Sequence, residues 1–499
     1  MVGCGPGGRF RAVEGYEDKR GAGESESVCE MSLRPLRAVE GYQAGAASMK
    51  EGPYIPHLFG EQLHDLYRAH RRWLTCAVEH SIAWPERDVL VQYDGQDYFL
   101  RGLRDSQDKP SPACISVRLR GDEVNADLSK VYKFSSILGW FKGGYVNVVG
   151  YISGTHPILY ASGNPRFAPV MQGGPNGFDC NFMPLVRDER IRKALAFWRE
   201  GLSLEHVNAG YAFLSFYKVI ESQFKKGRAK GNWINLQIPE LTGRAKERVD
   251  QLRAEEVDVG RHIFQSGRCA VAHSTLGEEL VDPDIPEDRI RIERDLVVVR
   301  ALAQKYIRQE LGVPNEMEVY ETRDALQPLY EYLDPNQRAK LRAGDSVPRK
   351  RLGLNNLKVS VNRWPHKAPV PLTNLTLKVI SAHDGLASVQ ATNDANNLSL
   401  AFLLDFPKKK AGPDLDSSSC VPIERGGTPE SVIAFLEYQK AVLGNGIIEI
   451  LFPNGQKAVC EIVIPVNVDI GATFNAINKQ IESAKGNSAS AEPMAPICD

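Results

Sequence analysis

The sequence predicts an α+β multidomain protein, in which a central all-α helical bundle is flanked by N-terminal and C-terminal β-rich domains. Through the middle of the chain, apolar residues recur at the period of an α-helix. On either side, apolar runs flank Asp94–Gly95 and Asn454–Gly455, which are strong signals for β-hairpins. The predicted segments are a disordered extension over 1–50, a β-rich domain over 54–180, the helical bundle over 188–313, a helical connector over 315–345, a β-rich domain over 355–470 and a disordered tail over 485–499.

The composition is that of an ordinary globular protein. Hydrophobic residues make up 42% of the chain, and 61 basic against 62 acidic residues give a net charge of −1. Because there is no global basic field, any contact with RNA must come from a local patch. The sequence has no apolar run of about 20 residues, so no transmembrane span and no membrane partner are predicted.

The N-terminus and the cysteines set further expectations. Residues 1–50 are rich in Gly, Glu, Ser and Ala and lack the apolar core of a signal peptide, and a start at Met49 stays open. The nine cysteines form no Cys-x-x-Cys pair, so neither a zinc site nor a disulfide framework is predicted, and no cofactor is expected. This pattern predicts a protein of the reducing cytoplasm.

The N-terminal domain is predicted to begin with a helix and to continue as strands. The helix is expected over Pro56 to Ser81. Strands are predicted at 88–93, 97–103, 113–119, 145–152 and 157–161, with a short helix over 130–141. Trp140, Phe141 and Tyr145 are expected in the hydrophobic core, and a ligand-stacking platform is the alternative interpretation.

The helical bundle is predicted from five amphipathic segments, which are 188–199, 204–226, 239–255, 259–274 and 286–311. In the last segment, one buried stripe is expected to hold Leu296, Val299, Ala303 and Tyr306.

The densest basic run of this unit consists of Lys225, Lys226, Arg228 and Lys230. Such a run can steer a phosphate backbone, although a solvated loop is the commoner meaning of the pattern. Just before it, Glu221 interrupts an apolar helix, and a carboxylate that faces a core needs a partner. Arg268 is one candidate for that partner.

The C-terminal third is predicted to be a β-rich binding or interaction module. One helix is expected over Pro429 to Leu443, with Thr428 as its N-cap. Strands are expected at 357–364, 375–382, 387–392, 398–406, 447–452 and 457–464. No Ser/His/Asp triad or paired-carboxylate arrangement stands out in this module.

The segment Gly260 to Ser274, GRHIFQSGRCAVAHS, carries the residues with the clearest chemistry. Taken as one α-helix, it advances about 100° per residue. Arg268 then lies roughly 100° to one side of its core-facing stripe and His273 roughly 120° to the other. The small residues Cys269 and Ala272 lie between them and leave room for a second helix or a phosphodiester. The stripe itself consists of Val259, Ile263, Gly267, Ala270, Val271 and Ser274, with Phe264 at its border.

Arg268 and His273 form a pair that suits cleavage of a phosphodiester without a metal. The arginine fork matches phosphate oxygens, and histidine takes and returns protons near neutral pH. On spacing alone, a solvated helix face with an incidental histidine is the commoner interpretation. A looser pair, Arg199 and His206, straddles a predicted helix end and is set aside.

Around this pair the sequence resembles the HEPN superfamily of helical nucleic-acid-associated domains. The resemblance rests on Arg268-Cys-Ala-Val-Ala-His273 and on the apolar helix Tyr211 to Phe224, and it extends over roughly residues 188–313. The sequence is most similar to HEPN proteins related to the ApeA defence family and to the methylamine-utilisation J-type proteins. The resemblance implies an up-down helical bundle with the motif on its third helix.

The resemblance also implies a function, which is a metal-independent endoribonuclease acting as a homodimer. His273 would be the acid and base, Arg268 would hold the scissile phosphate, and an activator would bind the β-rich domains in prokaryotic defence or stress response. Cys269 departs from the family pattern, because active members usually carry Asn, Asp or His there. The alternative is therefore a catalytically inactive scaffold for dimerisation or RNA binding, which serves as a sensor or adaptor.

Overall fold

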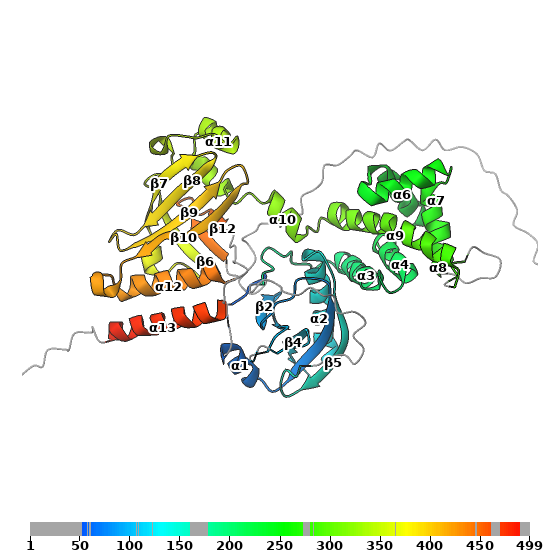
Figure 1. Cartoon of the computed structure of the whole chain (residues 1–499), viewed down its shortest axis with the longest axis horizontal. Coiled ribbons are helices and arrows are strands. Elements are labelled where there is room, and N and C mark those ends of the chain that lie inside the picture. Colours follow the sequence, from blue (N-terminus) through cyan, green and yellow to red (C-terminus); the bar gives the residue numbers. More distant parts are fainter. Residues whose placement is uncertain are drawn as a thin grey trace, which may run out of the picture. The chain divides into compact units, whose positions relative to one another are not determined.

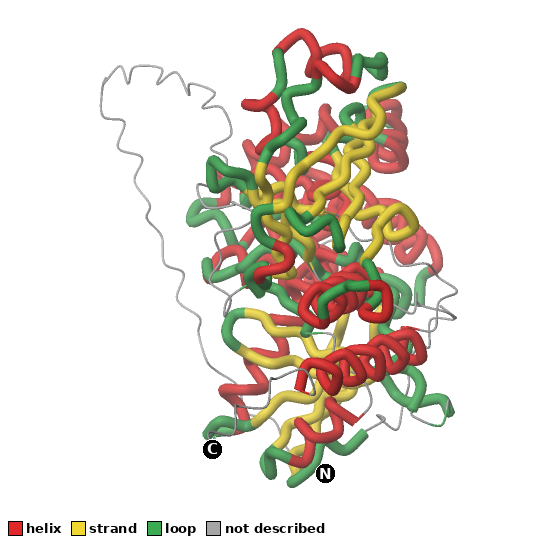
Figure 2. Tube along the Cα trace, turned by 90° about the vertical axis from the view of Figure 1, so that its left-hand side faces the viewer, coloured by secondary structure: helices red, strands yellow, loops and turns green. Residues whose placement is uncertain are grey.

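The computed structural model describes residues 52–489, apart from the segments 160–177, 273–279 and 461–469 and the positions 57, 59, 60, 106, 108, 122, 283, 365, 445 and 446. The predicted extension over 1–50 lies outside the described residues. Helices and two antiparallel sheets give an α+β protein with a central helical region and β-rich flanks, as the sequence predicted (Figure 1). The strands of the two sheets form two separate groups (Figure 2).

Five antiparallel strands form the N-terminal sheet, in the order β2-β3-β4-β1-β5. They are β1 (Trp73–His80), β2 (Val89–Tyr93), β3 (Gln96–Arg101), β4 (Cys114–Arg118) and β5 (Val146–Gly154). Asp94 and Gly95 join β2 to β3 with φ angles of 49° and 68°. Two left-handed residues are what the favoured two-residue hairpin turn requires, so the predicted hairpin is confirmed.

The predicted helix over Pro56 to Ser81 is wrong in its second half. Only α1 (Glu61–Arg68) is helical, and the following apolar run is β1, which pairs with β4 and β5. Trp73 packs on one face of the sheet beside α1, while Leu74 and Cys76 belong to the core on the other face. A continuous apolar run fits a strand buried on both faces as well as a helix, and only the pairing distinguishes the two. The described residues 157–159 do not form the strand predicted there.

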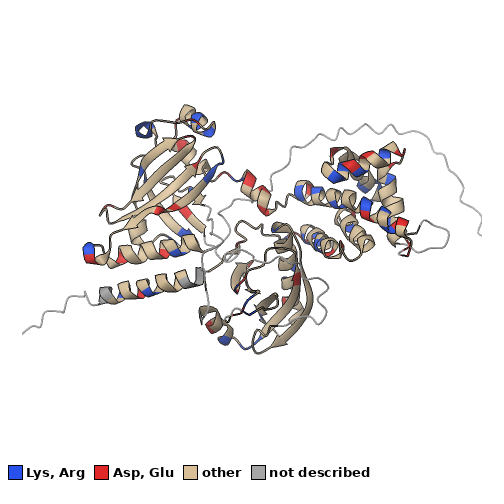
Figure 3. Cartoon of the chain, in the orientation of Figure 1, with Lys and Arg blue, Asp and Glu red and all other residues tan. Residues whose placement is uncertain are grey.

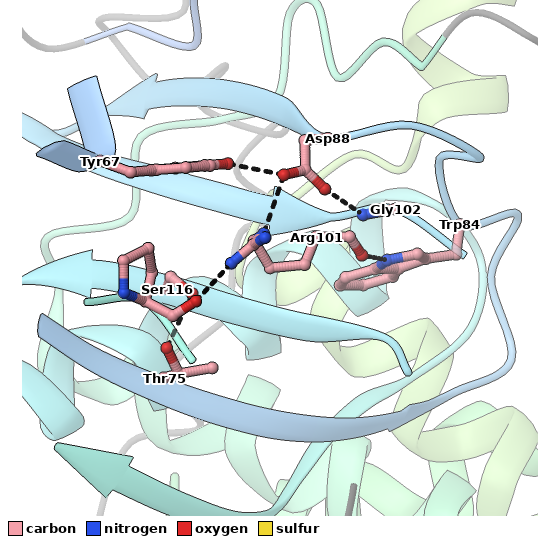
Figure 4. Close-up of polar contacts among 8 residues, drawn as sticks. Tyr67, Thr75, Trp84, Asp88, Arg101, Gly102 and Ser116 are labelled. Carbon is pink, nitrogen blue, oxygen red and sulfur yellow. Dashed lines mark hydrogen bonds and ion pairs between the residues drawn. The ribbon is translucent and has the colours of Figure 1, made fainter. Parts of the chain in front are cut away.

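A partly buried ion pair fastens α1 to this sheet (Figure 4). The Asp88 carboxylate accepts hydrogen bonds from the Tyr67 hydroxyl at 2.7 Å, from Arg101 Nε at 2.9 Å and from Gly102 N at 2.8 Å. Burial and the Asp88 charge raise the pKa of Tyr67, so its hydroxyl remains a donor. The three donors together hold α1, the start of β2 and the end of β3 in one arrangement.

Helix α2 (Val124–Phe141) packs against β1, β4 and β5. Trp140 and Phe141 are buried, and Trp140 packs edge-to-face against Trp198 of α3 (Glu189–Leu204), with ring centroids 5.3 Å apart. Tyr145 is partly buried and packs against the same core. The interpretation of these three aromatic residues as core is therefore confirmed.

The central region continues from α3 as a series of helices. The predicted stripe of the last long helix is confirmed, because Leu296, Val299 and Ala303 of α9 and Tyr306 at the start of η3 are all buried. Helix α3 packs on α4, and both α4 and α6 pack on α9. The elements after α3 are α4 (Ala209–Glu221), α5 (Gly227–Gln237), the 3-10 turn η1 (Ile238–Glu240), α6 (Gly243–Ala254), α7 (Val259–His262), the π-helical η2 (Ile263–Cys269), α8 (Ala270–Ala272), α9 (Pro286–Lys305), the π-helical η3 (Tyr306–Glu310), α10 (Glu316–Thr322), the 3-10 turn η4 (Gln327–Tyr332) and α11 (Pro335–Arg342).

Seven antiparallel strands form the C-terminal sheet, in the order β10-β9-β8-β7-β6-β11-β12. Helix α12 (Pro429–Leu443) packs against β9, β10 and β11, and Thr428 caps it by accepting a hydrogen bond from Ser431 N at 3.3 Å, as predicted. The sequence did not predict β10. The strands are β6 (Lys358–Trp364), β7 (Leu375–His383), β8 (Leu386–Thr392), β9 (Leu398–Asp405), β10 (Lys410–Cys420), β11 (Ile447–Leu451) and β12 (Lys457–Cys460).

Helix α13 (Ile470–Ala489) is a second element that the sequence did not predict. It packs on α12, where Ile477 and Ile481 are buried against Leu436 (Figure 1). Its end overlaps the start of the tail that was predicted to be disordered over 485–499, and residues 490–499 lie outside the described part. The sequence did not reveal this helix because most of its residues are small or polar. Its few apolar residues are buried only by packing on α12.

Candidate functional site

The motif segment is not one regular α-helix, as the sequence analysis assumed. Its first turn, α7, is α-helical, the seven residues of η2 are π-helical, and α8 is described as far as Ala272. A π-helical stretch bonds each residue to the fifth one along, so it widens the helix locally. The angles expected for a uniform helix therefore do not apply to Arg268, which lies within η2.

The core-facing stripe of the motif segment packs mainly on other helices. Val259, Ile263, Gly267 and Ala270 are buried, and the segment contacts α4, α5, α6 and α9. Gly267 lies directly over the ring of Phe213 on α4, where an added Cβ would come within 2.4 Å of the ring. Only glycine permits this close approach, which brings η2 next to α4.

Arg268 and Glu221 lie together at the end of α4. One terminal nitrogen of Arg268, Nη2, lies 3.5 Å from Glu221 Oε2, and Lys230 Nζ of α5 lies 2.7 Å from Glu221 Oε1. The side chains of Arg268 and Glu221 are 26% and 32% exposed, whereas that of Lys230 is 9% exposed. The cluster therefore holds two cations around one carboxylate, and Lys230 is its buried member while Arg268 and Glu221 are both partly exposed.

Glu221 stays ionised because its two cationic neighbours outweigh its burial. Burial acts to raise the pKa of Glu221, but the hydrogen bond and charge of Lys230 and the charge of Arg268 lower it below the usual value of 4.5. Burial raises the pKa of the neighbouring Tyr217, and the Glu221 charge adds to that effect. Lys230 Nζ also lies 4.8 Å from the centre of the Tyr217 ring. The carboxylate is thus a fixed negative charge that orients Arg268.

We expect a Glu221→Gln substitution to destabilise the protein more at neutral pH than in acid. A carboxylate whose pKa is lowered on folding stabilises the folded state above its ordinary pKa, and that contribution is lost as the pH falls through the lowered value. Because the pair is partly exposed, the loss at neutral pH is at most about 1 kcal/mol. Urea unfolding of both proteins at neutral pH and below pH 4.5 would measure it. A Glu247→Gln variant on the exposed surface of α6 is the control, and an equal loss at every pH would contradict the prediction.

The basic run after α4 divides into two parts. Lys230 is 7% exposed and is engaged by Glu221, while Lys225, Lys226 and Arg228 are exposed. In Figure 3, Lys and Arg are interspersed with Asp and Glu over the helices of this region. The basic run thus contributes three exposed cations and one buried cation that belongs to the Arg268 cluster.

A comparison with known protein families shows what this helical region is similar to. Residues 194–308 match the family model described as methylamine utilization protein MauJ. This part of the chain is similar to the MauJ family. The MauJ family is HEPN-like, so the resemblance predicted from the sequence is confirmed over this MauJ-like segment, which is about a quarter of the chain. No curated protein and no solved structure matched the chain.

Of the remaining motif residues in the MauJ-like segment, the structure describes Cys269 and Ala272. His273 lies outside the described residues. Cys269 is partly exposed and Ala272 is exposed, so the short side chains beside Arg268 lie at the surface. The looser pair is separated, because Arg199 donates to Tyr132 O at 2.9 Å while His206 lies beyond the end of α3.

Sequence reasoning missed a buried network that anchors the same motif segment. The Asp295 side chain of α9 is fully buried and accepts hydrogen bonds from Arg248 of α6 through Nε and Nη2, both at 2.8 Å. His262, one residue before the π-helical stretch, places Nε2 2.7 Å from the other Asp295 oxygen. The available signal was a carboxylate in the apolar stripe of α9, between Ile292 and Val299. The network fixes the start of η2 to both α6 and α9.

Two features are absent from the described residues. No group of three or more His, Cys, Asp or Glu in the described part could hold a metal ion. Within the described ranges, no helix has both the length and the apolar character that crossing a membrane requires.

Proposed function

We propose that this protein is a metal-independent endoribonuclease of HEPN type, which acts as a homodimer through an up-down bundle in its MauJ-like segment. The observation that carries the proposal is the position of Arg268, held by Glu221 at the surface of a segment similar to a HEPN-like family. The two β-rich domains would bind an activator, and the biological setting would be prokaryotic defence or stress response.

The proposed reaction needs only side chains of the motif. His273 takes the proton of a ribose 2′-hydroxyl, whose oxygen then forms a bond to the adjacent phosphorus while the bond from phosphorus to the 5′ oxygen breaks. The imidazolium of the second subunit returns a proton to the leaving 5′ oxygen. Arg268 stabilises the charge on the non-bridging phosphate oxygens. The products are a 2′,3′-cyclic phosphate and a 5′-hydroxyl end.

Several large apolar side chains of the MauJ-like segment are exposed and could contact a second subunit. A contiguous patch of such residues marks an interaction surface, whereas residues scattered singly are ordinary. The exposed large apolar residues of this segment are Val207, Tyr211, Leu236, Phe264, Leu280, Ile285 and Ile290. The main packing partners of the motif segment are helices of the same region, and the Arg268 side chain is 26% exposed, so a second subunit or RNA could reach it.

Cys269 favours a second candidate function, which is a non-enzymatic scaffold. A thiol is a weak donor and acceptor compared with the amide, carboxylate or imidazole that active relatives carry at this position. In that case the segment would bind RNA or a second copy of the chain without cleaving RNA. The same assay separates the two functions.

The test is cleavage of a mixed pool of tRNA and single-stranded RNA in EDTA. We expect the wild-type protein to produce cyclic phosphate ends and His273→Ala to lose about 100- to 10,000-fold in rate, because it removes the general acid and base. His206→Ala, an exposed histidine outside the motif, is the matched control and should keep wild-type activity. Oligomeric mass should be unchanged in all three proteins.

Two results would overturn the nuclease. Equal cleavage by wild type and His273→Ala would mean that the activity arises elsewhere. Intact RNA throughout, together with RNA binding and dimerisation by the wild type, would establish the scaffold instead.

A further inference from the structure

A cavity of 290 Å³ lies beside the β2–β3 hairpin, on elements other than those that carry Arg268. Its walls come from the hairpin, from the chain after β4, from α2 and from the first turns of α3. The volume is at the lower end of the range of about 300–1,000 Å³ that is typical of small-molecule sites. We call it the hairpin cavity.

Four cationic side chains converge on the hairpin cavity from three separate parts of the chain. Arg120 follows β4, Lys130 and Lys133 lie on α2, and Arg192 lies on α3. The lining contains one carboxylate, Asp94. Like charges repel, so their convergence from distant positions in the sequence favours an anion between them.

The nearby carboxylates offset part of this positive charge. Asp127 is buried behind the wall and pairs with Lys130 at 2.7 Å, and Glu189 at the start of α3 pairs with Arg192. The Arg192 hydrogen bond lowers the pKa of Glu189, and the charges of Arg192 and Lys133 add to that effect. Lys133 is exposed and lines the hairpin cavity, so its ammonium group can reach a ligand there.

Aromatic side chains contribute much of the remaining wall, and several contacts hold them and the hairpin in place. The rings of Tyr98 and Phe134 stack with centroids 4.0 Å apart, and the Tyr93 hydroxyl donates to Pro184 O at 2.7 Å. Arg120 Nη2 donates to Gly95 O at 2.8 Å and so braces the hairpin turn. A cavity whose walls are fixed in this way needs little ordering when a ligand binds.

Gln96 supplies an independent sign of a ligand. This residue lines the hairpin cavity and is only 4% exposed, and its Oε1 has no hydrogen-bond partner in the part of the chain that the structure describes. Buried carbonyl oxygens are nearly always paired. Because Gln96 Oε1 is enclosed in the structure, the side-chain amide must turn toward the hairpin cavity to accept a hydrogen bond from a ligand.

We propose that the hairpin cavity binds a small phosphate monoester that also carries hydroxyl or amine donors. Lys133, Arg192 and Arg120 hold the phosphate, because arginine forks and lysine charges together match its oxygens. Gln96 accepts a hydrogen bond from the remainder of the ligand, which lies along the wall of Tyr98 and Phe134. The site is distinct in residues from the RNA-cleaving site proposed above, and its test does not depend on cleavage.

The test is calorimetric titration of the full chain with ribose 5-phosphate, ribose and inorganic phosphate. We expect saturable binding of ribose 5-phosphate, weaker binding of inorganic phosphate, which lacks the hydroxyl donors for Gln96, and none of ribose. Lys133→Gln and Arg192→Gln should each weaken ribose 5-phosphate binding about tenfold or more, because each removes a charged contact to the phosphate.

Lys193→Gln is the matched control, since Lys193 is an exposed cation next to Arg192 that does not line the hairpin cavity. We expect its binding to change by less than about threefold, as a screened distant charge predicts. The proposal is overturned if ribose 5-phosphate does not bind, if all three variants weaken it equally, or if inorganic phosphate binds as tightly. Unchanged melting temperatures of the variants show that a loss of binding is not a loss of fold.

Discussion

An Arg268→Ala variant is expected to lose RNA cleavage by about 100- to 1,000-fold, the loss typical when one preorganised group that stabilises the transition state is removed. In the proposed mechanism Glu221 would position Arg268, since Glu221 Oε2 lies 3.5 Å from Arg268 Nη2 and Glu221 Oε1 lies 2.7 Å from Lys230 Nζ. Folding should hardly change, because a partly exposed ion pair contributes only about 0–1 kcal/mol. The measurement is the single-turnover cleavage rate in EDTA together with a thermal melt.

Further substitutions at and near Arg268 distinguish the contribution of its charge to the cleavage rate from that of its planar shape. Arg268→Lys keeps the charge but lacks the planar fork, so we expect it to recover only a small part of the lost rate. Glu221→Gln keeps Arg268 and should reduce the rate less than Arg268→Ala does. The control is Arg261→Ala, which should cleave RNA normally. Arg261 is exposed on the same segment and donates a hydrogen bond to Gln265. Full activity of Arg268→Ala would remove this residue from the mechanism.

An Asp295→Ala variant is expected to lose about 3–5 kcal/mol of unfolding free energy, the cost typical of removing one partner from a buried ion pair. The Asp295 side chain is fully buried and pairs with Arg248 at 2.8 Å and with His262 at 2.7 Å. Without it, the Arg248 guanidinium stays largely buried and loses its carboxylate, and His262 loses its hydrogen bond. Urea unfolding followed by far-ultraviolet circular dichroism would measure the loss.

A matched control for Asp295 lies on α6. Asp250 pairs with Lys246 at the surface, where both side chains are about half exposed, so Asp250→Ala should cost only about 0–1 kcal/mol. Asp295→Ala should also reduce RNA cleavage, because His262 joins the network to the start of η2. A loss below about 1 kcal/mol for Asp295→Ala would show that the network does not hold the motif segment.

The sequence predicted the structure best where a short local pattern is enough to specify a turn or a helix. The Asp94–Gly95 hairpin follows from two residues that tolerate positive φ, and the buried stripe of α9 follows from its spacing. It was misleading at Trp73–His80, because a continuous apolar run has no period that distinguishes a strand buried on both faces from a helix. It also missed α13, whose apolar face is short and packs only on α12.

The sequence by itself determined the residue types of the motif, its similarity to a HEPN-like family, and the alternation of β-rich and helical regions, because these depend on local spacing and composition. The tertiary structure alone decided which charges meet. Asp295, Arg248 and His262 lie on three helices, and the four cations of the hairpin cavity come from three parts of the chain. The π-helical form of η2, whose Gly267 packs on Phe213, likewise appears only in the tertiary structure. Contacts between side chains far apart in sequence depend on how the helices and strands pack, and a single sequence has no local pattern that encodes that packing.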